Sequence, residues 1–222
     1  MLQRKSKILI YFFLLIILGS INNTHLTNIK FNKVENINIS GLNYSDNKII
    51  LKKIKSLNLE NIFFLDKDAI NKIIDSNTSI HKYKIFKKYP STINIVIEKT
   101  VFLANMNYNG KIFTLGSNGK LTKNYFLNQD LPFIFGNPNI SEFLNLKKII
   151  DDSDISYNQI KNFYFFKSKR WDVELANNIL IKLSENKIKE SLDNAYKFLN
   201  DGNLENMKII DARIKNQIII ND

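Results

Sequence analysis

Residues 170–183 read RWDVELANNILIKL, and their apolar side chains alternate with polar ones on both sides of an Asn-Asn pair. Alternation with a period of two is typical of strands that bury one face. A two-residue loop at Asn177-Asn178 would pair Leu175 with Leu180 and mix the two faces. A three-residue loop, Ala176–Asn178, brings all the apolar side chains to one side. The resulting pairs are Leu175–Ile179, Val173–Ile181 and Trp171–Leu183.

The pattern therefore predicts a hairpin that ends in a residue of left-handed conformation. Asn178 suits that conformation better than any residue except glycine. Trp171, the single tryptophan, should lie in the core on the apolar face of the sheet. Asp172, Glu174 and Lys182 should point away from that core.

The composition supports a folded chain, because 44% of its 222 residues are hydrophobic and 24% are charged. The absence of cysteine excludes disulfides, thiolate zinc sites and cysteine nucleophiles, and two histidines argue against a histidine-rich metal site. The formal charge of +11 comes from lysines spread along the whole chain, whereas arginine occurs only at positions 4, 170 and 213. We therefore expect neither a nucleic-acid partner nor a small-molecule substrate.

The N-terminus carries a basic flank and then an apolar run from Ile8 to Leu18. Uncharged sequence continues to Thr24. The segment from Ile8 to Thr24 therefore has the minimum length of a membrane-spanning helix, about 17 residues. We expect residues 1–7 to be a cytoplasmic tail, 8–24 a transmembrane signal-anchor and 25–33 a linker. A cleaved signal peptide is the alternative. In either case the body of the protein is expected to be exported.

Residues 34–100 predict a small β-α-α-β-β domain. A strand at Val34–Ser40 is followed by a helix, for which Ser45-Asp46-Asn47 offers an N-cap. A second helix begins at Asp66 or Lys67. Ser79–Tyr89 predicts the next strand, and a turn at Tyr89–Ser91 leads to a strand in which Ile93, Ile95 and Ile97 alternate.

Residues 101–222 predict a second domain, of mostly antiparallel strands with two helices. Asn109-Gly110 and Asn118-Gly119 are signals for type I′ hairpin turns. Helical spacing occurs in 140–150 and 188–199, and strands are expected at 131–136, 160–166, 207–214 and 217–220. The fold class is therefore α+β.

Three features that resemble catalytic or ligand sites have simpler interpretations. Gly116–Lys120 lacks the spacing of a phosphate-binding loop, so it predicts a turn. Asp151, Asp152 and Asp154 follow a helix and predict a solvated turn. His81 lies in a strand and predicts a half-buried structural histidine. We expect no catalytic, cofactor-binding or metal-binding residues and hence no enzyme.

Several segments together resemble one protein family, the bacterial division proteins FtsQ and DivIB. Lys88–Lys99 (KYPSTINIVIEK) is similar to the end of the family's POTRA domain, and Leu131–Gly136 (LPFIFG) is similar to a later motif. Lys169-Arg170-Trp171 and Asp211-Ala212-Arg213 resemble two more. The order and spacing of these motifs span nearly the whole chain. The family pattern is not kept at Lys99, Thr100 and Ser184.

The resemblance implies a non-enzymatic scaffold of the divisome, which bridges early and late division proteins. It implies an inner-membrane protein with one type II span, a cytoplasmic N-terminus, a periplasmic body and a position at midcell. The implied partners are FtsB and FtsL, with FtsB adding a strand to the final strand of this chain. The residues expected to bind this partner are Lys169, Arg170, Arg213, Ile214, Asn216, Ile218 and Ile220.

The physics of the final segment agrees with that implication. Gln217–Ile220 is an apolar strand close to the C-terminus, and an open apolar edge is a hazard unless a partner covers it. Arg213 would pair with a partner carboxylate, and the outer side of the hairpin at Lys169 and Arg170 is expected near this strand. A POTRA-type periplasmic chaperone or translocation component is the alternative function.

Overall fold

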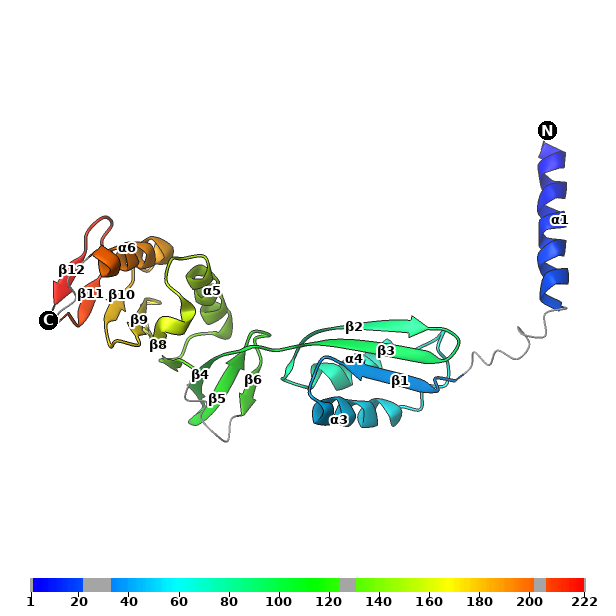
Figure 1. Ribbon diagram of the computed structural model, residues 1–222, viewed down its shortest axis with the longest axis horizontal. Helices are drawn as coiled ribbons and strands as arrows, with labels where there is room; N and C mark the ends of the chain where they lie inside the picture. Colours follow the sequence, from blue (N-terminus) through cyan, green and yellow to red (C-terminus); the bar gives the residue numbers. More distant parts are fainter. Residues whose placement is uncertain (1, 22–32, 124–130, 202–206, 222) are drawn as a thin grey trace. The chain divides into compact units, whose positions relative to one another are not determined.

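The structure, a computed structural model, describes residues 2–21, 33–123, 131–201 and 207–221. It contains two compact units (Figure 1). One consists of Met1–Asn77 with Lys82–Glu98, and the other of Thr78–His81 with Lys99–Asp222. The mixed α+β class expected from the sequence is confirmed by both units.

Helix α1 spans Leu2–Ile21, and its side chains from Ile8 to Leu18 are exposed. Within the described ranges, the structure contains no helix with the length and hydropathy needed to cross a membrane. The predicted spanning anchor at 8–24 is thus not confirmed. The predicted linker 25–33 falls, apart from Lys33, outside the described residues.

The first unit has the predicted β-α-α-β-β order. Its elements are β1 (Asn36–Ser40), α3 (Tyr44–Lys55), α4 (Lys67–Asp75), β2 (Ile80–Lys88) and β3 (Thr92–Lys99). The strand order is β1-β3-β2, and β1 runs parallel to β3. Both helices cover one face of this sheet (Figure 1). Their contacts are made by fully buried isoleucines, namely Ile50, Ile54, Ile70, Ile74, Ile93 and Ile95.

The helix starts follow from local capping. Asp66 caps α4 as predicted, because its side chain accepts a hydrogen bond from the Ala69 N–H at 3.0 Å. The expected cap of α3 at 45–47 is wrong, since Asn43 accepts from the Asp46 N–H at 2.8 Å and starts the helix at Tyr44.

The turn between β1 and α3 requires a glycine. Gly41 has a φ of 114°, which side-chain-bearing residues rarely adopt. A Cβ at this position would lie 1.7 Å from the carbonyl oxygen of Ile97. Gly41 therefore allows the chain to leave the sheet directly against β3.

The second unit is built on a nine-stranded sheet of order β12-β11-β10-β9-β8-β7-β4-β5-β6. The strands are β4 (Phe102–Tyr108), β5 (Lys111–Gly116), β6 (Leu121–Lys123), β7 (Phe133–Phe135), β8 (Ile160–Phe165), β9 (Trp171–Leu175), β10 (Leu180–Lys182), β11 (Ile209–Asp211) and β12 (Ile219–Asn221). The helices are α5 (Ile140–Asp151) and α6 (Ile188–Asp201), with a short 3-10 turn η1 (Tyr157–Gln159).

Most strand pairs of this sheet are antiparallel, as predicted, but three pairs are parallel. These pairs are β4–β7, β7–β8 and β10–β11. Parallel neighbours need a long crossover, and α5 and α6 provide the crossovers for the second and third pairs. The two predicted helices therefore determine which strands become neighbours.

The β9–β10 hairpin, within residues 170–183, has the predicted register. Val173 faces Ile181, the Leu175 N–H donates to the Ile179 carbonyl at 2.9 Å, and Asn178 has a φ of 64°. Trp171 is 4% exposed and packs against Phe163 in the core, as expected.

The other two hairpins differ from each other. Asn109 and Gly110 have φ values of 52° and 75°, as a type I′ turn requires. In the second hairpin only Gly119 has a positive φ, and its N–H donates to the Gly116 carbonyl at 2.9 Å. The second turn is thus a three-residue loop, and the predicted type I′ turn at Asn118-Gly119 is wrong.

Candidate partner-binding surface

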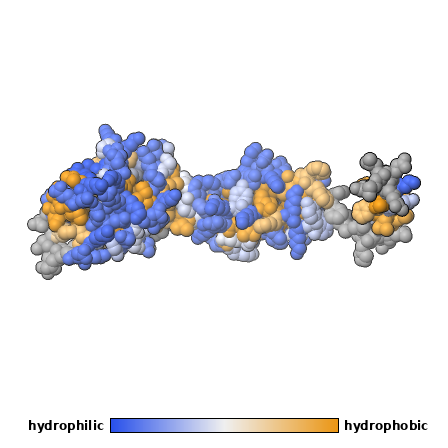
Figure 2. Space-filling model, turned by 90° about the horizontal axis from the view of Figure 1, so that it is seen from above, coloured by the Kyte–Doolittle hydropathy of each residue, from blue (hydrophilic) through white to orange (hydrophobic). Residues whose placement is uncertain are grey.

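Strand β12 forms one edge of the nine-stranded sheet. It pairs antiparallel with β11, and Asp211 faces Ile219 while Ile210 faces Ile220. Ile219 is 41% exposed and Ile220 is 43% exposed. Figure 2 shows apolar surface in orange at the end of this unit where Figure 1 places β11 and β12. The strand therefore presents an edge with partly exposed apolar side chains.

The predicted partner residue Ile218 lies in a different environment. It is half-buried and packs against the hydrophobic core of this unit. Ile219, which the sequence reasoning did not select, is exposed instead. The expected strand was 217–220, whereas the observed strand starts at Ile219. The expected strand therefore placed Ile218 on the partner side in place of Ile219.

The turn between β11 and β12 contains two more of the predicted residues. The Gln217 N–H donates to the Ile214 carbonyl at 3.3 Å, and Asn216 has a φ of 57°. Asparagine tolerates this left-handed conformation, so the chain can reverse here without a glycine. Ile214 is 52% exposed. Both residues therefore lie on the surface beside the start of β12.

A row of charged side chains crosses the sheet from β9 to β11. The strand registers place Asp172 opposite Lys182, and Lys182 opposite Asp211. Residues directly opposite each other share a face, so these three side chains lie on the face away from the core. Asp211 in turn faces Ile219 of the edge strand.

An arginine lies at each end of this row. The Arg170 Nε donates to Asp172 Oδ1 at 3.1 Å, and the Arg213 Nε donates to Asp211 Oδ1 at 2.8 Å. The charges thus alternate through Arg170, Asp172, Lys182, Asp211 and Arg213, a set that we call the charge ladder. The sequence singled out the two arginines, but not that Asp172, Lys182 and Asp211 lie opposite one another on the three strands between them.

The pKa values of Asp172, Asp211 and Arg213 are shifted. Burial raises the pKa of the Asp172 carboxyl above its usual value, although Arg170, the Leu183 N–H and Lys182 oppose that effect. The hydrogen bond from Arg213 lowers the pKa of Asp211. The pKa of Arg213 is raised, chiefly by its hydrogen bond to Asp211 and also by Asp172. Arg213 is therefore held by a carboxylate of its own chain.

Asp172 lies on the face away from the core, as predicted, but it is only 2% exposed. The Arg170 side chain, stacked 4.3 Å from the Phe166 ring, bonds to it. Lys169 is exposed in the turn before β9, with a φ of 61°. Lys169 and Arg170 lie at the same end of the sheet as Arg213, but β10 and β11 separate them from β12.

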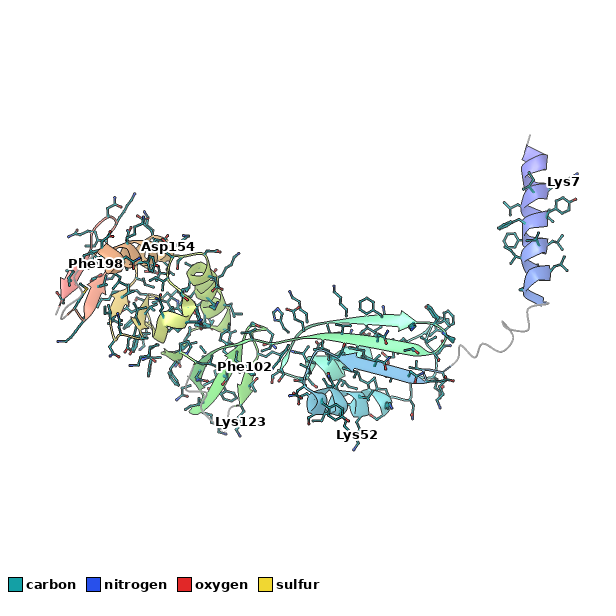
Figure 3. All side chains as sticks on the ribbon, in the orientation of Figure 1. Lys7, Lys52, Phe102, Lys123, Asp154 and Phe198 are labelled. Carbon is teal, nitrogen blue, oxygen red and sulfur yellow. The ribbon has the colours of Figure 1, made fainter. Side chains whose placement is uncertain are left out.

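The aspartates after α5 do not form a ligand site in the described residues. Asp151 pairs with Lys147, and the Asp154 N–H donates to Asp193 Oδ1 of α6 at 3.2 Å (Figure 3). His81 is half-buried, as expected, with Nδ1 3.4 Å from Ser117 Oγ. Over the parts of the chain that the structure describes, no group of three acidic, histidine or cysteine side chains could hold a metal ion.

Taken together, the features described above define a class: a small β-α-α-β-β domain followed by a mixed sheet with an open terminal edge. The family profile of the FtsQ-type POTRA domain matches residues 32–99. The cell division protein FtsQ of Rickettsia conorii is 26% identical over 195 residues, which cover 85% of this chain and 72% of that protein. The chain therefore carries an FtsQ-type POTRA domain, and over most of its length it is similar to cell division proteins of the FtsQ/DivIB family.

Two further relatives cover less of the chain. The cell division protein DivIB of Staphylococcus aureus is 34% identical over 92 residues, or 41% of this chain and 21% of that protein. The solved major extracytoplasmic domain of DivIB from Geobacillus stearothermophilus overlaps 47% of this chain and 98% of its own, with a TM-score of 0.33 and 12% identity.

Proposed function

We propose that this chain is a non-enzymatic scaffold of the divisome that captures FtsB, and with it FtsL, by adding a strand to β12. The observation that carries the proposal is the place of β12 at the sheet edge, with Ile219 and Ile220 partly exposed. An edge strand offers unpaired backbone groups, and a partner strand would satisfy them and cover the apolar side chains. In this way the protein would bridge early and late division proteins.

The charge ladder supports this mode of binding by orienting the surface next to the edge. Asp211 faces Ile219 and holds Arg213, so the guanidinium has a fixed position beside the incoming strand. An arginine that is already held loses less side-chain entropy when a partner arrives. Two strands, β11 and β10, lie between β12 and the start of β9, where Lys169 and Arg170 lie, so these two residues would contact a partner segment outside the added strand.

The strand-addition proposal is tested by photocrosslinking in dividing cells. A photoreactive phenylalanine analogue replaces Ile219 or Ile220, and the matched control replaces Lys123 in β6, the opposite edge strand (Figure 3). We expect crosslinks to FtsB from both β12 positions and none from Lys123. Ile218 is unsuitable for this test because it packs against the core.

The opposite result is equally clear. Crosslinks to FtsB from Lys123 alone, or equal yields from both edges, would exclude β12 as the strand that the partner extends. A protein that localises to the septum but gives no β12 crosslink would keep the scaffold role and lose the strand-addition mechanism.

We further propose that α1 attaches the chain to the inner membrane as a single-pass type II segment, with the N-terminus cytoplasmic and the body periplasmic at midcell. The exposed apolar side chains from Ile8 to Leu18, after the basic N-terminal flank, support an anchoring role. The relatives are named as cell division proteins, which supports a position at midcell. The alternative, a POTRA-type periplasmic chaperone or translocation component, stays a prediction.

A further inference from the structure

One face of β2 carries a basic column that no part of the proposed function uses. The strand alternates, and its outward positions are Lys82, Lys84, Phe86 and Lys88, all exposed. The inward positions face the helices, as the 2.9 Å hydrogen bond from Tyr83 Oη to Asn71 of α4 shows. The outward column therefore lies on the face of the small sheet away from α3 and α4.

The neighbouring strands add little opposing charge to this face. On β3 the outward side chains include Val96, which is 47% exposed, and Glu98. On β1 they are polar and neutral, and Asn38 donates to Asn94 of β3 at 2.9 Å. A groove of about 680 Å³ is lined by Lys82, Lys84, Val96 and Glu98 among others. The face thus combines three lysines, one acidic group and exposed apolar side chains.

An aromatic tip extends this column where β2 turns into β3. Phe63 and Tyr89 stack with their ring centroids 5.0 Å apart, and Phe64 beside them is 87% exposed. The Asn61 side chain accepts from the Phe63 and Phe64 N–H groups at 2.8 and 3.3 Å, so the loop is held in place. Figure 2 shows pale orange surface at this end of the unit. Exposed rings on an ordered loop require an explanation.

The tip also lies at the end of the unit where β1 begins. The Glu35 N–H donates to the Ser91 carbonyl at 2.9 Å, which places the start of β1 next to the turn after Tyr89. The chain between Ile21 of α1 and Asn36 could span at most about 50 Å if fully extended. Anything that α1 binds is therefore within reach of this end of the unit.

We propose that this surface, the lysine column of β2 with the tip residues Phe64 and Tyr89, docks on the anionic headgroup layer of a lipid bilayer. Lysines are attracted to anionic headgroups, and aromatic rings favour the boundary between headgroups and acyl chains. The inference rests in part on the proposed anchoring by α1. It adds a second, peripheral contact that orients the small domain on the membrane.

Because the chain contains no cysteine, a single introduced cysteine can carry an environment-sensitive dye. The full-length Phe64→Cys protein is labelled and mixed with vesicles of phosphatidylcholine and phosphatidylglycerol that contain a lipid-borne quencher. We expect a blue shift and loss of roughly half the emission, weakened by salt. The matched control is Tyr44→Cys, which is 81% exposed at the start of α3, at the other end of the unit. The emission of the dye at position 44 should remain unquenched.

Charge reversal separates this docking from the anchor. Lys82→Glu, Lys84→Glu and Lys88→Glu together should restore the emission at position 64, while the protein still sediments with the vesicles through α1. The matched reversal of Lys52, Lys53 and Lys55 on α3, of which Figure 3 labels Lys52, should leave the quenching unchanged.

Equal emission from the Phe64 and Tyr44 labels on sedimenting vesicles would overturn the docking and leave the anchor intact. Failure to sediment at all would overturn both. Quenching that survives reversal of the β2 lysines would overturn the role of the lysine column. Capture of FtsB at β12 is read by crosslinking, so its outcome is independent of these results.

Discussion

Asp172 shows how one residue connects the core to the surface. The sheet places it outside the apolar face, yet its carboxyl is 2% exposed and bonded to Arg170. Burial raises its pKa, so in the folded protein the carboxylate depends on the arginine to remain charged. Removing the arginine should therefore cost more than removing an ordinary surface charge.

We expect Arg170→Ala to lower the free energy of unfolding by about 1–3 kcal/mol at neutral pH, because it leaves a buried carboxylate without its cation. The pKa of Asp172 would rise further, and the stability cost of a raised folded-state pKa grows as the pH rises above the unfolded-state pKa and is complete above the folded-state pKa. The deficit should thus shrink as the pH falls. Urea unfolding at about pH 7.5 and about pH 4.5 measures both effects.

Lys167→Ala, at an exposed position in the same turn, is the control and should change stability by less than about 0.5 kcal/mol. An Arg170→Ala deficit that is the same at both pH values would show that Asp172 does not cause it.

At the level of elements, the β9–β10 hairpin depends on the backbone conformation of one residue. Asn178 has a φ of 64°, and its side chain accepts from Lys161 Nζ at 2.7 Å. Residues with a Cβ pay for this conformation, whereas glycine does not. The loop should therefore distinguish alanine from glycine at position 178.

We expect Asn178→Ala to destabilise the second unit by about 1–2 kcal/mol, and Asn178→Gly to cost clearly less. Thermal unfolding monitored by the fluorescence of Trp171 measures the difference, because this tryptophan lies in the same hairpin. Equal losses in both variants would point to the Lys161 contact as the cause, since both substitutions remove it.

The hairpin could be predicted because its information is local: alternation and one turn residue determine the register. The neighbours of β7 and β11 could not be predicted this way, since α5 and α6 bring distant segments together. The candidate site likewise has one part that could be predicted from the sequence and one part that could not. Arg170 and Arg213 were selected from the sequence, whereas their places at the two ends of one row of charges follow from strand registers that only the fold supplies.

At the level of the whole molecule, each compact unit has its own buried side chains and its own sheet. The two proposed interactions fall in different units. The β12 edge belongs to the second unit, and the lysine column of β2, from Lys82 to Lys88, lies in the first. Substitutions at one surface should therefore leave the activity of the other unchanged.

The proposed anchor predicts where the full-length protein is found. A fluorescent fusion should form a ring at midcell, and the protein should remain with membranes after alkaline extraction. Leu14→Glu together with Leu15→Glu should release it, since charged side chains are costly in a bilayer. The control, Lys52→Glu with Lys53→Glu on α3, should keep both properties. A dispersed envelope pattern of the unaltered protein would favour the chaperone alternative.

The charge ladder has a kinetic consequence for partner capture. Three positive and two negative side chains alternate within a few strands, so their fields largely cancel at a distance greater than the Debye length. Electrostatic steering from this face would be weak, and the association rate should depend little on salt. Selectivity would instead arise after contact. A partner whose charges complement the charge ladder would remain bound, and a partner that places like charges opposite one another would dissociate.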